Sequence, residues 1–178
     1  WFTGYDTFGY VFFQTLILDQ KGNIILLTRA PDLRQAQNTS NIKDIRIWVD
    51  QDGINPTDDL KQILNELNLK DKNIGIEYEA YGMTGRNALR LNKSLENYCN
   101  VEDQSELITK LRVIKSDEEL VYVKKAAELA DRALDEAWKH TKAGASEAKI
   151  LAEMQRAVLE GGGDYPANEY IIGSGDNA

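Results

Sequence analysis

Cysteine and histidine are almost absent from the sequence, which has one residue of each, Cys99 and His140. A lone cysteine excludes an internal disulfide, which fits a protein of the reducing cytoplasm. A zinc or dinuclear metal site needs several converging ligands, and these two residues stand in no CxxC or HExxH spacing. The sequence therefore predicts no complete catalytic site in this chain, and no residue is assigned as catalytic or as a metal ligand.

Clusters of basic residues are also absent. Lys and Arg number 21 against 29 Asp and Glu, and the formal net charge is −8. Nucleic acids and anionic lipid surfaces are bound through clustered cations, so both are excluded as partners. The longest apolar stretch, residues 10–18, is far shorter than the roughly 20 residues of a membrane helix and lacks the flanks of a signal peptide.

Both ends of the chain look abrupt, and the first residues have the composition of a protein interior. Trp1 stands in place of an initiator methionine, and Phe2 and Tyr5 follow it closely. At the other end, the sequence stops at Ala178, just after a strand-like run that includes Ile171 and Ile172. We therefore expect the chain to be a piece of a larger protein.

The first hundred residues combine strand and helix patterns. Aromatic, β-branched or alternating apolar residues predict strands, with a hairpin turn at residues 20–23. These predicted strands cover residues 10–18, 24–27, 45–49 and 73–77. A helix is predicted from the Asn55-Pro56 pair, because apolar residues then recur at helical spacing, and a second helix is predicted over residues 84–95. This mixture indicates an α/β domain.

The composition changes near residue 110, where we place a domain boundary. Ser116 and Glu119 have the spacing of a capping box and predict a long amphipathic helix of about six turns. Ser146 is predicted to cap a second helix, which the glycines at 161–163 end. A strand is predicted over residues 169–172.

The side chains with chemical potential also have structural interpretations. His140 follows Lys139 near a helix end, and we predict contact with solvent or the last carbonyls rather than metal binding. Cys99 is interpreted as a buried structural thiol rather than a nucleophile. The aromatic residues within positions 1–13 either fill the core or, because Gly4 and Gly9 interrupt them, line a pocket or interface.

Six segments, in order, carry a resemblance to a known family. They are WFTGY at 1–5, LRVIKSDEE at 111–119, the alanine-rich stretch at 126–134, KAGASE at 142–147, GGDYP at 162–166 and IGSG at 172–175. Their order and spacing resemble the creatinase/prolidase family of pita-bread metallopeptidases, although Ala143 stands where that family usually has proline. The segment at 162–166 is also similar to the ectoine-hydrolase branch.

The resemblance implies an α/β fold in two parts. Residues 1–110 would form a ribonuclease-H-like creatinase N-terminal domain, with a mixed sheet and helices, whose first strand and helix precede Trp1. Residues 111–178 would form the first helices of a truncated pita-bread α+β catalytic domain. The five metal ligands of the family, two Asp, one His and two Glu, would follow residue 178.

The resemblance further implies a cytoplasmic, metal-dependent hydrolase of Xaa-Pro dipeptides or peptides, acting as a homodimer. The full-length parent would hold two divalent ions (manganese, cobalt or zinc), and this fragment none, so the fragment itself is predicted to be inactive. In the family, the N-terminal domain of one subunit caps the active site of the other. Residues assigned here to the walls of a site for a proline-containing peptide or small amide are Trp1, Phe2, Tyr5, Tyr165 and Pro166.

Two alternatives stay open. One is a creatinase- or ectoine-type hydrolase that breaks a C–N bond in a small metabolite. The other is a non-catalytic peptide-binding module, because relatives with an inactive pita-bread domain bind partners instead. The metal ligands of the complete protein would distinguish these functions.

Overall fold

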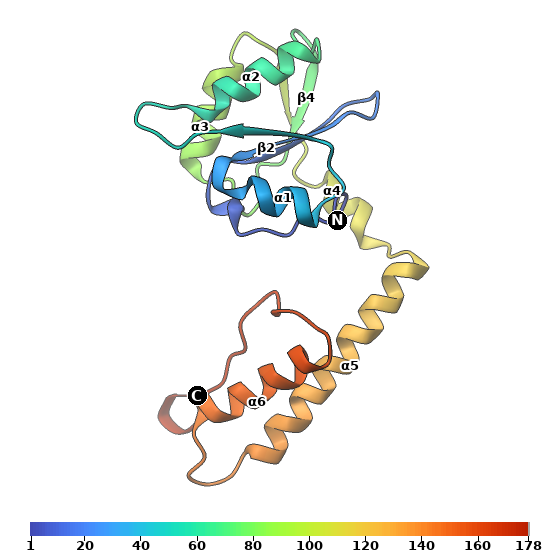
Figure 1. The fold of residues 1–178 in the computed structure, drawn as a ribbon, viewed down its shortest axis with the longest axis vertical. Helices are drawn as coiled ribbons and strands as arrows, with labels where there is room; N and C mark the ends of the chain where they lie inside the picture. The colour runs from blue at the N-terminus through green and yellow to red at the C-terminus, as the bar shows by residue number, and fades with distance from the viewer. Residues whose placement is uncertain (178) are drawn as a thin grey trace. The chain divides into compact units, whose positions relative to one another are not determined.

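A computed structural model describes residues 1–177 of the chain, which divide into two compact units. The first unit covers residues 1–111 and the second begins at residue 112. Figure 1 shows a mixed sheet-and-helix arrangement in the first unit and helices in the second. None of the helices within residues 1–177 is long and apolar enough to cross a membrane.

A three-stranded sheet forms the first half of the N-terminal unit. β1 (Thr15–Leu18) pairs antiparallel with β2 (Ile24–Arg29), and β2 pairs parallel with β3 (Asp44–Trp48). The β1–β2 turn is held by Asp19, whose carboxylate accepts hydrogen bonds from the backbone N–H groups of Lys21 and Asn23. The short 3-10 helix η2 (Ala30–Asp32) and helix α1 (Leu33–Thr39) connect the parallel strands β2 and β3.

A second, two-stranded sheet follows. β4 (Asn73–Ile76) pairs parallel with β5 (Asn100–Asp103), and α3 (Gly85–Leu95) forms the crossover between them. Helix α2 (Pro56–Glu66) links β3 to β4 and is capped by Asn55, whose side chain accepts a hydrogen bond from the N–H of Thr57. Thr84 caps α3 in the same way.

Both sheets contribute to one apolar core. Leu27 and Leu95 are almost completely buried, and Ile63 and Leu64 of α2 pack in the same cluster. A smaller cluster of Leu26, Ala36 and Ile42 lies with α1, against which Tyr5, Leu16 and Ile45 pack. The apolar residues predicted at helical and strand spacing therefore form a core within the first unit.

The second unit is built on two long helices. α4 (Leu107–Val113) precedes α5 (Asp117–His140) and α6 (Glu147–Glu160), and α5 packs along α6. The predicted capping box is present: the Ser116 side chain accepts from the N–H of Glu119, whose carboxylate accepts from the N–H of Ser116. Ser146 occupies the first position before α6, but its side chain makes no capping hydrogen bond.

Several expected elements differ from the structure. Residues 169–172 do not form the predicted strand, since no strand within residues 1–177 pairs with them. The stretch predicted as one strand over residues 10–18 contains part of the short 3-10 helix η1 (Gly9–Val11) and then β1. Residues 1–5, the first of the segments that carry the family resemblance, have irregular backbone. Helices α1 and α4 and strand β5 were not predicted.

Candidate functional site

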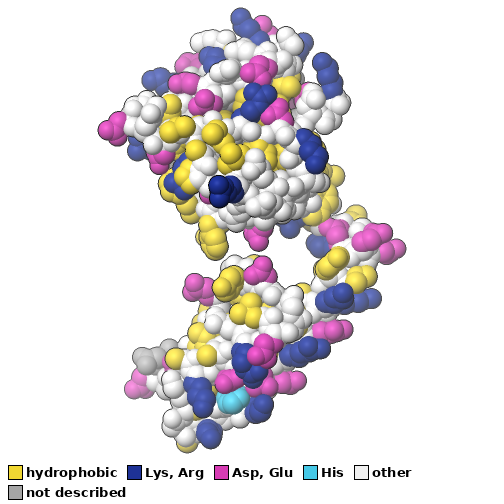
Figure 2. Space-filling view, in the orientation of Figure 1, with side chains coloured by type: hydrophobic (Ala, Val, Ile, Leu, Met, Phe, Trp, Pro, Cys, Tyr) yellow, Lys and Arg dark blue, Asp and Glu magenta, His cyan; other side chains and the backbone are white. Residues whose placement is uncertain are grey.

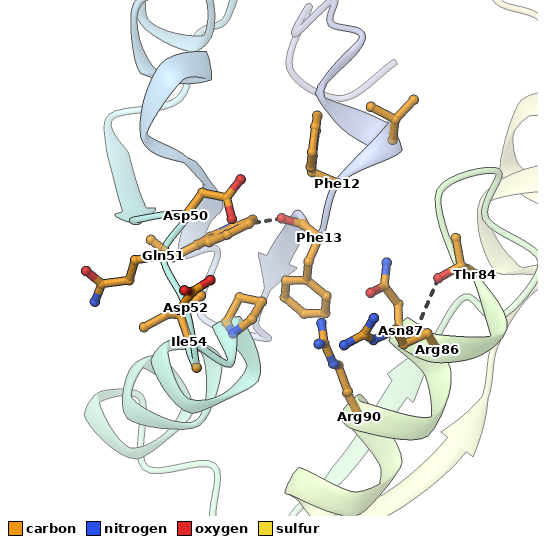
Figure 3. A pocket seen from close by; sticks show the side chains of 14 residues that line it. Phe12, Phe13, Asp50, Gln51, Asp52, Ile54, Thr84, Arg86, Asn87 and Arg90 are labelled. Atoms are coloured by element: carbon orange, nitrogen blue, oxygen red, sulfur yellow. Dashed lines mark hydrogen bonds between the residues drawn. The ribbon is translucent and has the colours of Figure 1, made fainter.

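A pocket of about 380 Å³ lies in the first unit, where the chain leaves β3 and enters α2. The first turn of α3 and the segment before β1 complete its walls (Figure 3). In sheets with parallel strands, ligands bind outside the carboxyl ends of the strands, where loops and helix N-termini meet. The position of this pocket beyond β3 and at the start of two helices follows that rule.

Two aromatic side chains form the apolar wall. Phe13 and Trp48 are both buried, and the indole Nε1–H of Trp48 donates a 2.9 Å hydrogen bond to the carbonyl oxygen of Phe13. This bond fixes the end of β3 to the segment that precedes β1. The wall therefore has a defined shape before any ligand enters.

Charged side chains stand on both sides of this wall. Arg86 and Arg90 point from α3 toward Phe13, and Asp50 and Asp52 lie on the other side of the Phe13 ring in the view of Figure 3. Among the residues that the structure describes, neither arginine has an ion-pair partner. The two guanidinium groups are therefore free to bind an anion.

Arg29 contacts two of the residues that line the pocket, Phe12 and Asp50. Its guanidinium stacks on Phe12, with 3.4 Å from the guanidinium carbon to the ring centroid. It also lies 3.5 Å from a carboxylate oxygen of Asp32 and 3.8 Å from one of Asp50. Asp50 is thus partly neutralised, whereas Asp52 has no ion-pair partner within residues 1–177.

Three aromatic residues of the first unit, Trp1, Phe2 and Tyr5, were assigned to the wall of a substrate site. The rings of Trp1 and Phe2 meet edge to face, with centroids 4.7 Å apart, and both side chains are exposed. Tyr5 instead packs against the smaller core cluster, and its hydroxyl is buried without a hydrogen-bond partner in the described part of the chain. The structure thus brings Trp1 and Phe2 together on the surface and turns Tyr5 inward.

The two candidates in the second unit lie after α6, in irregular backbone. Tyr165 is 77% exposed, and its backbone N–H donates to the carboxylate of Asp164. Pro166 is also exposed. Their assignment as substrate-binding residues stays a prediction.

His140 belongs to a network between α5 and α6 instead of contacting solvent or the last carbonyls alone. Its Nε2 lies 3.2 Å from Glu136, and ligand atoms of Glu136, His140 and Glu153 all lie within 4.8 Å of one another. Figure 2 shows His140 among acidic and basic side chains. Arg156 already pairs with Glu153 at 2.8 Å, and Lys139 with Glu136 at 3.2 Å.

This network does not fit the two divalent ions that the resemblance implies. It offers only three ligands, and each carboxylate is already paired with a cation, Glu136 with Lys139 and Glu153 with Arg156. It is the one group of three or more candidate metal ligands within residues 1–177. No reaction step is therefore assigned to a metal held by this chain.

Cys99 is half-buried against the main core. Burial raises the pKa of its thiol, and the nearby Lys61 opposes this shift in part. A raised pKa lowers the fraction of reactive thiolate at neutral pH, which agrees with a structural thiol.

The pocket itself was not predicted from the sequence. Arg86 and Arg90 are spaced to share one face of a helix, and no acidic residue of α3 pairs with them. An arginine pair without acidic neighbours is a signal for anion binding, but the facing carboxylates come from a distant segment that only the fold brings close.

Two family models match the chain. The creatinase/prolidase N-terminal domain matches residues 1–114, and metallopeptidase family M24 matches residues 121–178. These matches confirm both the resemblance and the predicted fold class.

Curated relatives are similar to this chain over part of their own length. A hydrolase/peptidase of Sinorhizobium fredii, itself uncharacterised, is 27% identical over 170 residues, which cover 92% of this chain and 43% of that protein. An Xaa-Pro dipeptidase of Pyrococcus furiosus is 29% identical over 100 residues, covering 54% of this chain and 29% of that protein. The chain thus spans less than half the length of these relatives.

Solved structures share the fold. The X-Pro aminopeptidase from Thermotoga maritima has a TM-score of 0.68 and 21% identity, with 84% of this chain and 38% of that chain covered. A dipeptidase from Pyrococcus horikoshii has a TM-score of 0.64 and 25% identity, with 89% and 42% covered.

Proposed function

The chain belongs to the creatinase/prolidase family, and we propose that it forms part of a metal-dependent hydrolase of Xaa-Pro dipeptides or peptides. Residues 1–110 would be the N-terminal domain and residues 111–178 the beginning of the catalytic domain. The observation that carries the proposal is the succession of the two family models along one chain, together with the Xaa-Pro dipeptidases among its relatives.

The metal centre of this enzyme would lie outside the described residues. Two divalent ions, of manganese, cobalt or zinc, would supply a hydroxide nucleophile and stabilise the developing negative charge. The residues of this chain would contribute walls and contacts instead. Trp1 and Phe2 are exposed and adjacent, which supports a role in capping the active site of the other subunit of a homodimer.

Two proteins test this proposal: the chain of residues 1–178 and the product of the full reading frame that contains it. We expect the longer protein to hydrolyse glycyl-proline with added manganese and to elute as a dimer. The shorter chain should show no turnover and no bound metal by mass spectrometry after dialysis. Turnover with two metals per short chain would refute its inactivity, and a longer protein that cleaves only a small non-peptide amide would refute the dipeptidase assignment.

A further inference from the structure

The pocket beyond β3 has free positive charge on one side and acidic side chains on the other. Arg86 and Arg90 are one helical turn apart on α3, so their guanidinium groups reach the same space (Figure 3). A pair of guanidinium groups suits a carboxylate, because each offers several N–H donors in a planar fork. The N-terminal end of α3 at Gly85 adds partial positive charge to this side.

The acidic side of the pocket consists of Asp50 and Asp52, which differ in their ion pairing. Asp52 has no ion-pair partner within residues 1–177, and Asp50 is shared with Arg29 at 3.8 Å. Neither aspartate pairs with Arg86 or Arg90 among the described contacts, although all four line the same pocket. A ligand that carries an ammonium group and a carboxylate at opposite ends would satisfy both sides at once.

The volume of the pocket limits the size of that ligand. The ring of Phe13 lies between the two sides in Figure 3, and the pocket volume of about 380 Å³ is within the range of small-ligand sites. In a free amino acid the ammonium and the carboxylate are attached to the same carbon. In a dipeptide the two Cα atoms are about 3.8 Å apart, so its charged ends lie farther from each other.

We propose that this pocket binds a dipeptide-sized zwitterion, with its carboxylate at Arg86 and Arg90 and its ammonium toward Asp52 and Asp50. An apolar side chain of the ligand packs on the wall that Phe13 and Trp48 form. The site consists of residues 11–90 of one chain, so it does not depend on the proposed hydrolase activity or on a metal.

Titration of the nitrogen-15-labelled chain tests the proposal by NMR. The indole N–H of Trp48 lies in the pocket wall and serves as the reporter, and the indole of Trp138, which is 74% exposed in the second unit, serves as internal control. The probe is glycyl-L-leucine, because a dipeptide without proline keeps the result separate from Xaa-Pro hydrolysis. We expect a saturable shift of the Trp48 signal and none of the Trp138 signal.

Three further probes remove one feature each. N-acetylglycyl-L-leucine lacks the ammonium, glycyl-L-leucinamide lacks the carboxylate, and L-leucine is shorter. Each should bind at least about tenfold more weakly than glycyl-L-leucine. The proposal is overturned if glycyl-L-leucine gives no saturable shift at millimolar concentration or if the blocked probes bind equally well.

Variants assign the two ends. Arg86→Ala with Arg90→Ala should weaken binding of glycyl-L-leucine and of its N-acetyl form at least about tenfold. Asp52→Asn should weaken binding of glycyl-L-leucine, which has a free ammonium, and leave binding of its N-acetyl form unchanged. Lys93→Ala, an exposed cation of the same helix, is the matched control and should change neither. An equal loss in Lys93→Ala would contradict the site, and the comparison of probes stands even if a variant fails to fold.

Discussion

Trp48 connects two segments that are distant in the sequence through a single buried hydrogen bond. Replacing it with phenylalanine removes the Nε1–H donor and leaves the carbonyl of Phe13 without this partner. A buried acceptor that loses its partner costs about 1–3 kcal/mol. We therefore expect Trp48→Phe to lower the free energy of unfolding of the first unit by about that amount, measured by urea denaturation.

Trp138 provides the matched control for this substitution. Its side chain is 74% exposed, so Trp138→Phe removes little buried surface. Surface changes of this kind stay within about 0.5 kcal/mol. Equal destabilisation by the two variants would show that the Trp48 hydrogen bond is not the cause.

The thiol of Cys99 gives a prediction about pH. Burial disfavours the thiolate, which raises the pKa, while the positive charge of Lys61 favours the thiolate. Alkylation by iodoacetamide should therefore be slower in the folded chain than in the urea-unfolded chain, and its rate should rise at a higher pH. Lys61→Ala removes the charge that favours the thiolate, so the alkylation rate should then rise only at a still higher pH. A folded profile that coincides with the unfolded one would contradict the shift.

The same shift has a consequence for stability. Because the folded-state pKa is above the unfolded value, this thiol favours the folded state fully only below the unfolded pKa. Its contribution is then lost as the pH rises through the folded pKa.

Individual residues were predictable when their partners are close in sequence. Asn55, Ser116 and Glu119 act as caps through neighbours two or three residues away, and all three were identified from the local pattern. Arg90 was not identified as a pocket residue, because the acidic side chains opposite it come from the segment after β3. Capping and periodicity patterns cover only neighbouring residues, so they cannot identify a charged residue whose counterpart lies far away in the sequence.

At the scale of elements, the two long helices begin with serines that differ in their bonding. The side chain of Ser116 accepts a hydrogen bond at the start of α5, whereas that of Ser146 makes no capping bond at the start of α6. Losing a capping side chain costs about 0.5–2 kcal/mol. Ser116→Ala should therefore lower the free energy of unfolding of the second unit by this amount, followed by circular dichroism at 222 nm.

Ser146→Ala serves as the comparison for this experiment. It removes a hydroxyl that forms no capping bond, so we expect a change within about 0.5 kcal/mol. If Ser146→Ala were as destabilising as Ser116→Ala, the loss of the capping hydrogen bond would not explain the effect of Ser116→Ala.

The errors in element prediction have a common cause. The polar sequence of β5 (Asn100–Asp103) has no alternating apolar pattern, yet it forms a strand because β4 supplies a parallel partner. Residues 169–172 are apolar but have no strand partner within residues 1–177, and they are irregular. Helix α1 buries only Ala36, so its periodicity was too weak to detect. Strand formation depends on a partner more than on composition.

At the scale of the whole molecule, the buried apolar residues are distributed unequally between the units. Both hydrophobic clusters of the first unit lie within residues 1–111. In the described part of the second unit the buried apolar side chains are Ala133, Ile150 and Val158. The sequence predicted this core through its periodicity, whereas the pocket needed the topology that brings α3 to the end of β3.

This distribution predicts how separate fragments behave. A fragment of residues 1–111 retains its whole core and should unfold cooperatively in urea with a well-dispersed NMR spectrum. A fragment of residues 112–178 buries few apolar side chains to offset the loss of conformational entropy, so its helices should be only partly formed. Cleavage or separate expression of the two fragments, followed by circular dichroism and NMR, measures both. A fully helical, cooperatively unfolding monomer of residues 112–178 would show that the packing of α5 on α6 is sufficient by itself.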